Sequence, residues 1–485
     1  MSKLETPYRI SHWIDGMPID DQTASVIPNV NPATGNIIGE IPIADASMVD
    51  RAVQAAKNAF HSWSSMPAEV RAAWLNRLAD AIDAEQEALA FAETTDSGKP
   101  LWLSKKVDIP RASANFRFFA AAATQFASES HSGPNSIDYT LRQPLGVVGC
   151  ISPWNLPLYL FTWKIAPALA AGNTVVAKPS EVTPSTAFLL GVLMQRIGFP
   201  PGVLNIVQGD GPMTGESIVT HPEVKAISFT GSTRAGQRIA SLLAPGLKKY
   251  SLELGGKNAA VIFSDADFES VLTETIRSSY TNQGEICLCT SRLLIEDSLY
   301  DRFKEGFIER VKQLTIGDPL NDLHKQGALV SESHFQKVSQ CVELAKEEGG
   351  KVLVGGQRHL AEGPCAGGFF YAPTVIEGLG PNAKTNQEEI FGPVVTLQRF
   401  HNEEEAVALA NASGYGLAAT VWTTELKKAH RVATALQTGI VWVNSWLYRD
   451  LRTPFGGMKN SGIGREGGWE AMRFFTEPKN ISIRF

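Results

Sequence analysis

Cys287 is the residue of this 485-residue chain best suited to act as a nucleophile. It lies in the segment NQGEICLC, after a stretch of helical character and a polar Asn-Gln-Gly turn, a setting that can expose a thiol. An unperturbed thiol is mostly protonated at neutral pH, so a reactive one needs a general base or local positive potential. A lone cysteine is more often a small buried hydrophobic residue, and the spacing alone favours that interpretation.

The same segment gives little support to a metal site. Cys287 and Cys289 form a C-x-C pair without a second pair elsewhere, and the nine histidines include no H-E-x-x-H motif. We therefore expect no metal. The five cysteines are odd in number and sparse for this length, which suits a reducing compartment better than a disulfide framework.

Two polar residues elsewhere have the chemistry that such a thiol requires. Glu253, in LELGGKN, ends a β-rich run just before two glycines, where a carboxylate can activate water. Asn155, in ISPWNLP, carries an amide that can donate a hydrogen bond to an oxyanion. A salt-bridged strand-end Glu and an ordinary turn Asn remain open as alternatives.

Two strand ends have features of nucleotide binding. FTGSTRAG runs from a strand into a helix with Gly231 and Gly236 five apart, so it is neither G-x-G-x-x-G nor a phosphate loop. Its backbone N–H groups would favour a pyrophosphate, although a plain turn is equally compatible. KPSE ends another strand with Lys178 and Glu181, where a carboxylate can hold ribose hydroxyls or form a surface ion pair.

Alternating strands and helices must position these residues. From about residue 145 the runs GVVGCIS, NTVVAKPS, VLNIVQG and VKAISFTG are β-rich and separated by helical stretches, which predicts a parallel, helix-covered sheet. A second such series follows SLELGGKNAAVIF to about residue 445, so we expect two α/β domains. Residues 46–98 are helical by periodicity and should cover one face of the first sheet. SGPNSIDYTLRQP and the terminal KNISIRF should be exposed strands that pair between subunits.

Composition excludes several classes of protein. With 44% hydrophobic and 19% charged residues, the chain is typical of globular α/β enzymes. A net charge of -6 and a pI near 5.9 argue against nucleic acid as a partner. The N-terminus resembles neither a signal nor a transit peptide, and the most apolar stretch, residues 157–177, is interrupted by polar and helix-breaking residues. We expect a cytoplasmic protein that does not span a membrane.

The motifs PWN, KPSE, FTGS, LELGGK, NQGEIC and EEIFGP, in this order and spacing, resemble the aldehyde dehydrogenase superfamily. The resemblance extends from NPATG at 31–35 to PFGGMKNSGIGREGG at 454–468. It implies an α/β fold with a Rossmann-like NAD-binding domain, an α/β catalytic domain and a small β oligomerisation element in a homodimer or homotetramer. The corresponding residues are 1–122 and 145–255 for the first, 256–457 for the second, and 123–144 and 473–485 for the third.

The resemblance also assigns roles. It implies that Cys287 is the nucleophile, Glu253 the general base and Asn155 the oxyanion donor in an NAD-dependent oxidation through a thiohemiacetal and a thioester. Glu253 disfavours a CoA-acylating enzyme, and Glu181 favours NAD over NADP because a 2′-phosphate would meet a carboxylate. The residues matching cofactor contacts are Trp154, Lys178, Glu181, Gly231, Ser232, Glu389 and Phe391.

Two arginines, Arg111 and Arg449, fall where unselective members of the superfamily have apolar or aromatic pocket residues. A guanidinium pair in an apolar pocket is poorly placed unless it meets an anion, and Arg suits planar recognition of a carboxylate. DIPR and W-x-x-R-[DE]-L resemble the branch that acts on 2-aminomuconic and 2-hydroxymuconic 6-semialdehydes. Surface charge remains the alternative for both arginines. The apolar neighbours expected in the pocket are Leu156, Tyr159, Trp163 and Phe455.

Other functions stay open at this point. An enzyme for uncharged or cationic aldehydes, of the betaine aldehyde type, should have aromatic residues or carboxylates in place of the two arginines. A non-catalytic member should lack the thiol, the base or the oxyanion donor, and this chain has all three. The sequence does not choose between an amino and a hydroxyl group on the substrate, between dimer and tetramer, or between tryptophan and other aromatic catabolism as the source of the aldehyde.

Overall fold

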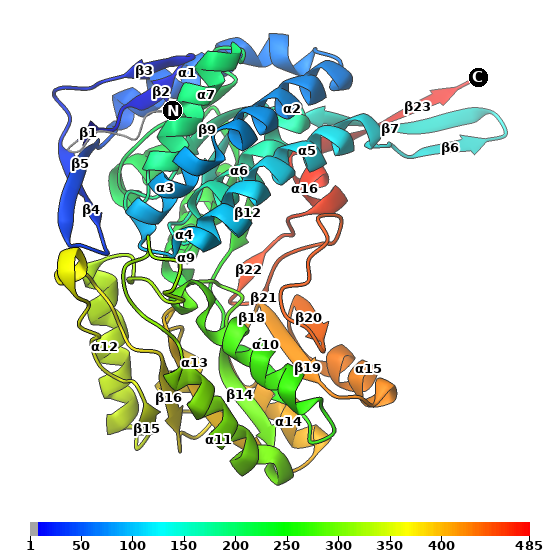
Figure 1. Cartoon of the computed structure of the whole chain (residues 1–485). Coiled ribbons are helices and arrows are strands. Elements are labelled where there is room, and N and C mark those ends of the chain that lie inside the picture. The colour runs from blue at the N-terminus through cyan, green and yellow to red at the C-terminus, as the bar shows by residue number, and fades with distance from the viewer. Residues whose placement is uncertain (1–7) are drawn as a thin grey trace.

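The protein is described by a computed structural model that covers residues 8–485. Two large sheets, each flanked by helices, form the upper and lower parts of the molecule in Figure 1, and a narrow three-stranded arm projects from the upper part. In residues 8–485 no helix is both long and apolar enough to cross a bilayer. The α/β fold class is as the sequence predicts.

The upper sheet has eight strands in the order β22-β12-β11-β8-β9-β10-β2-β3. Its five central strands are parallel, and β8 and β9 are buried along their whole length, as expected for a sheet covered on both faces. The parallel strands are β8 (Val147–Ile151), β9 (Thr174–Lys178), β10 (Leu204–Ile206), β11 (Val224–Thr230) and β12 (Lys249–Glu253). The edge strands β2 (His12–Ile14), β3 (Met17–Ile19) and β22 (Gly462–Ile463) are antiparallel additions that the sequence did not indicate.

Residues 46–98 form three helices, and the expectation that they cover one face of the upper sheet is wrong. Helix α1 (Ala46–Ser64) packs on one face through Val49, Val53 and their neighbours, together with α8 (Glu216–Thr220) and α9 (Thr233–Leu243). Helices α2 (Ala68–Ala84) and α3 (Gln86–Ser97) belong to the hydrophobic core of the opposite face. Periodicity identifies an apolar stripe but not the surface on which it packs.

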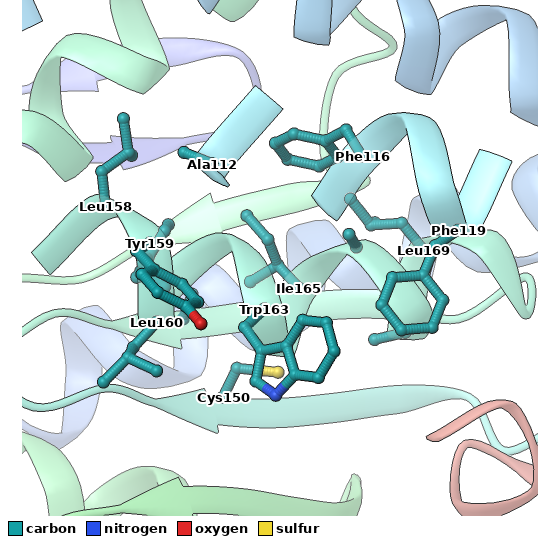
Figure 2. Close-up of a cluster of buried hydrophobic side chains, with 14 of the residues drawn as sticks. Ala112, Phe116, Phe119, Cys150, Leu158, Tyr159, Leu160, Trp163, Ile165 and Leu169 are labelled. Carbon is teal, nitrogen blue, oxygen red and sulfur yellow. The ribbon is translucent and has the colours of Figure 1, made fainter. Parts of the chain in front are cut away.

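The core of that opposite face lies between the sheet and three layers of helix. Helices α6 (Pro157–Ala170) and α7 (Ser185–Ile197) contact the sheet, α5 (Ile109–Gln125) packs on α6, and α2 packs on α5. Figure 2 shows Phe116 and Phe119 of α5 beside Tyr159 and Trp163 of α6, with Cys150 of β8 beneath them. Because α6 is buried along its entire length, every residue of this helix has a fixed environment.

The lower sheet has seven strands in the order β15-β16-β17-β14-β13-β19-β20, all parallel except β15. Helices α10 (Phe268–Tyr280) and α11 (Asp297–Lys312) cover one face, and α14 (Glu403–Asn411) and α15 (Leu426–Ala435) cover the other. Helix α12 (Glu332–Glu347) packs near β15. The strands are β13 (Asn258–Ile262), β14 (Thr290–Glu296), β15 (Lys351–Val354), β16 (Thr374–Glu377), β17 (Val394–Phe400), β19 (Ala418–Trp422) and β20 (Ile440–Val443).

The projecting arm consists of three antiparallel strands, β6 (Ser130–Gly133), β7 (Ser136–Pro144) and β23 (Thr476–Arg484) (Figure 1). Two segments far apart in sequence thus pair with one another, from Thr476 opposite Pro144 to Arg484 opposite Ser136, and β23 follows α16 (Gly468–Phe474). The predicted strands are therefore present and largely exposed. Their role between subunits stays a prediction, as does the proposed division into domains.

Small elements complete the chain. A further three-stranded sheet and a two-stranded sheet lie outside the two large ones. These strands are β1 (Tyr8–Arg9), β4 (Val26–Asn31), β5 (Asn36–Pro42), β18 (Tyr415–Gly416) and β21 (Met458–Lys459). The short helices are α4 (Leu101–Leu103), α13 (Lys384–Gln387), the π-helices η1 (Ser104–Asp108) and η2 (Gly211–Gly215), and the 3-10 helices η3 (Ala244–Gly246), η4 (Thr281–Gly284) and η5 (Gly363–Cys365).

Candidate active site

Cys287 lines two cavities of about 180 Å³ each, and a much smaller one of about 20 Å³. The chain reaches it through a sharp turn at η4, where Asn282 and Gln283 have φ angles of 53° and 55°. Gly284 follows at φ 72°, and a Cβ atom there would lie 2.3 Å from the carbonyl oxygen of Gly392, so no larger residue fits. This turn directs the chain between the two sheets and places the thiol where the two larger cavities meet.

The thiol of Cys287 is half-buried and forms no disulfide; all five cysteines are free. Its desolvated surroundings raise the pKa of Cys287, and the negative charges of Glu389 and Glu253 raise it further. The thiol is therefore protonated at rest and needs a base to become a nucleophile. Residues 8–485 contain no cluster of His, Cys, Asp and Glu side chains that could hold a metal ion.

Asn155 lines one of the two larger cavities together with Cys287. We call it the cofactor-side cavity because most of the residues predicted to contact the cofactor also line it. Asn155 lies two residues before α6. Its side-chain amide donates to the carbonyl oxygen of Glu285 over 2.9 Å, and its own carbonyl accepts from Lys99 and Asn282 over 2.9 and 3.1 Å. Three hydrogen bonds therefore fix this residue although it is in a loop. Among residues 8–485 the amide has no other side-chain partner, and its Oδ1 is buried without a hydrogen bond. Its second N–H can therefore donate to an oxyanion in the cavity that Asn155 and Cys287 both line.

Glu253 lies on the other side of Cys287, in the second cavity. Only 3% of its surface is exposed, and neither carboxylate oxygen has a hydrogen-bond partner in the described part of the chain. Burial raises the pKa of Glu253 well above the usual value, and the nearby Glu466 raises it further while Lys164 opposes this. A carboxyl group with a raised pKa and no partner can take a proton from a thiol or from water.

A glycine provides the space for this carboxylate. Gly456 has a φ of 153°, and a Cβ atom there would lie 2.6 Å from Oε1 of Glu253. The segment PFGG therefore does more than turn the chain, because a side chain at this position would displace the base.

The cofactor-side cavity lies at the carboxyl ends of the strands of the upper sheet, the usual place for ligands in open α/β sheets. Ser232 caps α9 by accepting a hydrogen bond from the backbone N–H of Ala235, and the positive end of this helix faces a position where a phosphate is favoured. Five of the seven predicted cofactor residues line the cavity with Asn155 and Cys287, namely Trp154, Gly231, Ser232, Glu389 and Phe391.

The remaining two predicted cofactor residues are outside that lining. Lys178 ends β9 and is buried, and its ammonium group pairs with the carboxylate of Glu181 at 3.2 Å. The Glu181 side chain is partly exposed. Lys178 therefore lies at the strand end and Glu181 three residues after it, and neither is in the lining of the cavity.

The lining of this cavity has an unused polar group and a close backbone approach that suit a bound cofactor. The buried hydroxyl of Thr230 on its wall has no hydrogen-bond partner among residues 8–485. Gly255 lets the Glu389 carboxylate approach, since a Cβ atom there would lie 2.2 Å from Oε2 of Glu389. Phe391 has a left-handed backbone with φ 62°, and its carbonyl accepts a hydrogen bond from His334 over 2.7 Å. A backbone held in this unfavourable region is typical of a functional site.

The second cavity is mostly apolar. Three of the four apolar residues predicted for the pocket line it, namely Leu156, Tyr159 and Phe455, whereas Trp163 lies just outside. Leu103, Ile286 and Trp446 also contribute. Besides Cys287 and the arginines described below, the polar residues of the lining are Asp108, Thr230, Glu253, Thr281 and Glu466. An elongated organic substrate with an apolar middle fits such a wall.

Arg449 lines this second cavity, and Arg111 lies next to it. The Arg449 guanidinium donates to the Tyr159 hydroxyl over 3.0 Å and lies 4.1 Å from the Phe455 ring centre. The Arg111 guanidinium lies 5.2 Å from the Tyr159 ring centre, and its Nη2 is buried without a partner. Burial lowers the pKa of Arg111, and Arg449 lowers it further. Within residues 8–485 neither arginine meets a carboxylate, so two positive charges converge unpaired.

Sequence reasoning missed several residues of the site. His334 and Lys337 of α12 line the cofactor-side cavity, and their spacing of three is the only sequence signal they give. Arg277 lines the second cavity, where it stacks on Trp446 at 4.9 Å and pairs with Glu274. Unlike the two predicted arginines, it has a carboxylate partner.

The comparisons agree with this geometry. The sequence profile of the aldehyde dehydrogenase family matches residues 19–481. The 2-aminomuconic semialdehyde dehydrogenase of Danio rerio is 49% identical, over 95% of this chain and 96% of that protein. The 2-hydroxymuconic semialdehyde dehydrogenase of Pseudomonas sp. (strain CF600) is 45% identical, over 98% and 99%. PnpE of Pseudomonas sp. WBC-3, crystallised with nicotinamide adenine dinucleotide, superimposes with a TM-score of 0.95 at 40% identity, over 98% and 97%.

The chain therefore belongs to the aldehyde dehydrogenase family. Both the family and the α/β fold predicted from the motifs are confirmed. The two curated relatives differ in the substituent named on their substrates, so the choice of substrate needs an argument from this chain's own residues.

Proposed function

We propose that this protein oxidises a semialdehyde that carries a carboxylate at its far end, either 2-aminomuconic or 2-hydroxymuconic 6-semialdehyde, to the dicarboxylic acid. The enzyme is an NAD-dependent aldehyde dehydrogenase. The observation that carries the choice of substrate is the pair Arg111 and Arg449, whose guanidinium groups converge near the cavity of Cys287 without a carboxylate partner in the described residues.

The residues around Cys287 account for each step of the oxidation. Glu253 takes the proton of the thiol and later releases it to solvent. The thiolate attacks the aldehyde carbon, and the amide of Asn155 stabilises the oxyanion of the resulting thiohemiacetal. Collapse of this oxyanion expels a hydride and leaves a thioester on Cys287. Glu253 then removes a proton from a water molecule that attacks the thioester carbon; the C–S bond breaks, which releases the carboxylic acid and leaves Cys287 as a thiolate.

NAD, when bound, supplies the acceptor for the hydride. Ser232 at the start of α9 and Gly231 before it suit the pyrophosphate, whereas Glu389 and Phe391 suit the nicotinamide half. Glu181 would accept hydroxyls of the adenosine ribose and would repel a 2′-phosphate, which favours NAD over NADP.

The charge of the second cavity distinguishes the proposed substrate from the alternatives. A cationic aldehyde of the betaine type would be repelled by Arg449 and Arg111. An uncharged aldehyde would leave the two guanidinium groups without an anion in apolar surroundings, an arrangement that costs free energy. A carboxylate removes both problems, because each guanidinium can donate two hydrogen bonds to it.

The test is a steady-state comparison with NAD of three kinds of aldehyde: the two muconic semialdehydes, an uncharged aldehyde of similar length, and betaine aldehyde. We expect kcat/KM to be highest for the muconic semialdehydes and lowest for betaine aldehyde. Comparable values for all three kinds would refute the carboxylate proposal. The ratio between the amino and hydroxy substrates then identifies the preferred one.

A further inference from the structure

Lys99 lies at the centre of a buried charged cluster that the proposed chemistry does not use. It follows Gly98, whose φ of 76° ends α3 and turns the chain inward; a Cβ atom there would lie 2.8 Å from the Ala328 carbonyl oxygen. The Lys99 side chain is 1% exposed, and its ammonium group lies 2.5 Å from Asp108 and 3.6 Å from Glu93. Both carboxylates are fully buried.

The cluster joins one ammonium group to two carboxyl groups in buried surroundings. Burial raises the pKa of Glu93 to about 8; Lys99 opposes this shift and Asp108 adds to it. The shorter of the two contacts of the Lys99 ammonium group is with Asp108. A buried ion pair of this kind adds little net stability compared with apolar residues, so it is weak evidence of a purely structural role.

The third partner of Lys99 is the loop that carries the oxyanion donor. Its ammonium donates to the Asn155 carbonyl oxygen over 2.9 Å. Asn282 is the other donor to this oxygen, at 3.1 Å. A carboxylate oxygen of Glu93 accepts from the backbone N–H of Leu158 over 3.2 Å, in the first turn of α6. The cluster therefore holds the backbone at Asn155 and again three residues later, at Leu158.

The same cluster also fixes the start of the helix that carries Arg111, one of the two arginines proposed to bind the substrate carboxylate. Asp108 ends η1 and immediately precedes α5, the helix of Arg111. Asn115 of α5 donates to the Tyr159 carbonyl in α6 over 3.1 Å and accepts from Arg111. Lys99 thus links two segments of the site. It contacts the start of α5, whose Arg111 is proposed to bind the substrate carboxylate, through Asp108. It contacts the loop that is proposed to bind the aldehyde end through the Asn155 carbonyl.

We propose that Lys99 is a positioning residue that sets the place of the Asn155 amide relative to Cys287 through the ammonium–carbonyl hydrogen bond. This inference rests on the proposed function, in which Asn155 stabilises the oxyanion. Lys99 does not line either cavity and touches neither substrate nor thiol; it acts through the backbone of Asn155.

The test is a double-mutant cycle on the full-length enzyme with NAD and 2-hydroxymuconic semialdehyde. Lys99→Met removes the ammonium but leaves Asp108 unpaired, so the main variant is the charge-balanced pair Lys99→Met with Asp108→Asn. Because Asp108 also lines the second cavity, Asp108→Asn alone is the reference for the pair. Each of the three variants is made alone and with Asn155→Ala. The matched control is Lys304→Met, because Lys304 also pairs with two carboxylates, Glu377 and Asp301, in the lower part of the molecule.

We expect the Lys99→Met/Asp108→Asn enzyme to lose about 10-fold or more in kcat, with KM changed about 3-fold or less and the Kd for NAD, measured by fluorescence titration, unchanged. In the Asn155→Ala background the same change should alter kcat by less than about 3-fold, because the group that Lys99 positions is gone. The control should keep its kcat.

Two results would overturn the inference: unchanged kcat in the charge-balanced variant, or an equal loss of kcat with and without Asn155. The second would indicate a general structural role. Failure of the proposed function gives a different result, because Asn155→Ala alone would then retain full activity or the unmodified enzyme would not turn over the semialdehyde.

Discussion

Arg449 donates a hydrogen bond to the hydroxyl of Tyr159 over 3.0 Å, although 290 residues separate them in the sequence. Tyr159 lies in the buried helix α6, three residues after Leu156, and its ring also faces the guanidinium of Arg111. The hydroxyl therefore orients one arginine and the ring face attracts the other. A neutral aromatic residue allows two positive charges to converge, and the substrate can provide the negative charge.

Removing either of the two arginines should weaken binding of a carboxylated substrate but not binding of an uncharged aldehyde. Arg111→Ala or Arg449→Ala should raise KM for the muconic semialdehyde by roughly 10- to 150-fold, from ~1.5–3 kcal/mol per charged hydrogen bond. We expect the larger effect at Arg449, which lines the cavity. Steady-state assays with the semialdehyde and with an uncharged aldehyde give the comparison, and the uncharged aldehyde should be almost unaffected.

Arg117→Ala is the matched control, because Arg117 lies six residues after Arg111 on the same helix and pairs with Asp80 and Asp83 at the surface. It should leave both KM values unchanged, since exposed ion pairs contribute little. Equal losses with both aldehydes in the Arg111 and Arg449 variants would mean that these arginines are structural.

The motifs were sufficient to predict the family, the parallel sheets and the strands of the arm. Short motifs at strand ends are local features, and the carboxyl ends of parallel strands meet at one edge, so their proximity follows from the fold. Cys287, Glu253 and Asn155 do lie around the same pair of cavities, as this reasoning predicts.

Tertiary contacts between distant segments could not be predicted. Lys99 looks like an ordinary lysine before a proline, and only the fold brings it to Asn155. His334 contacts the Phe391 carbonyl across 57 residues. The antiparallel strands β2 and β3 are only three residues long each, too short for an alternation of apolar and polar residues to be visible in the sequence. Such contacts depend on packing, which leaves no local pattern.

Activity should rise with pH through the neutral range. Burial raises the pKa of Glu253, Glu466 raises it further, and Lys164, Arg465 and Arg449 oppose this. A base works only when deprotonated, so the active fraction grows as pH increases toward this pKa and falls below it. The raised pKa of the Cys287 thiol gives the same sign. Values of kcat measured from about pH 6 to about pH 9.5 should show the rise.

A second variant tests the cause of this pH dependence. Glu466→Gln removes the negative charge that raises the pKa of Glu253, so the rise in kcat should move to lower pH. A profile that falls with increasing pH, or one that Glu466→Gln moves to higher pH, would contradict this electrostatic account.

Replacing the thiol should separate chemistry from cofactor binding. Cys287→Ala should abolish NADH formation, whereas the Kd for NAD should change little, because most of the cofactor-side cavity is formed by other residues. Absorbance at the NADH band and a fluorescence titration with NAD measure the two properties on one preparation. Weakened NAD binding together with partial turnover would point to a packing role for Cys287.

The most direct test of the central claim is the mass of the enzyme after a single turnover. In Glu253→Gln, incubated at about pH 9.5 so that a fraction of the thiol ionises without a base, the thioester should form but hydrolyse slowly, by roughly 100- to 10,000-fold, because the base that activates water is absent. Acid quenching and peptide mass analysis after mixing with NAD and muconic semialdehyde should then show an acyl group on the peptide that contains Cys287, with about one NADH released per subunit. Sustained turnover with an unmodified Cys287 would contradict the account.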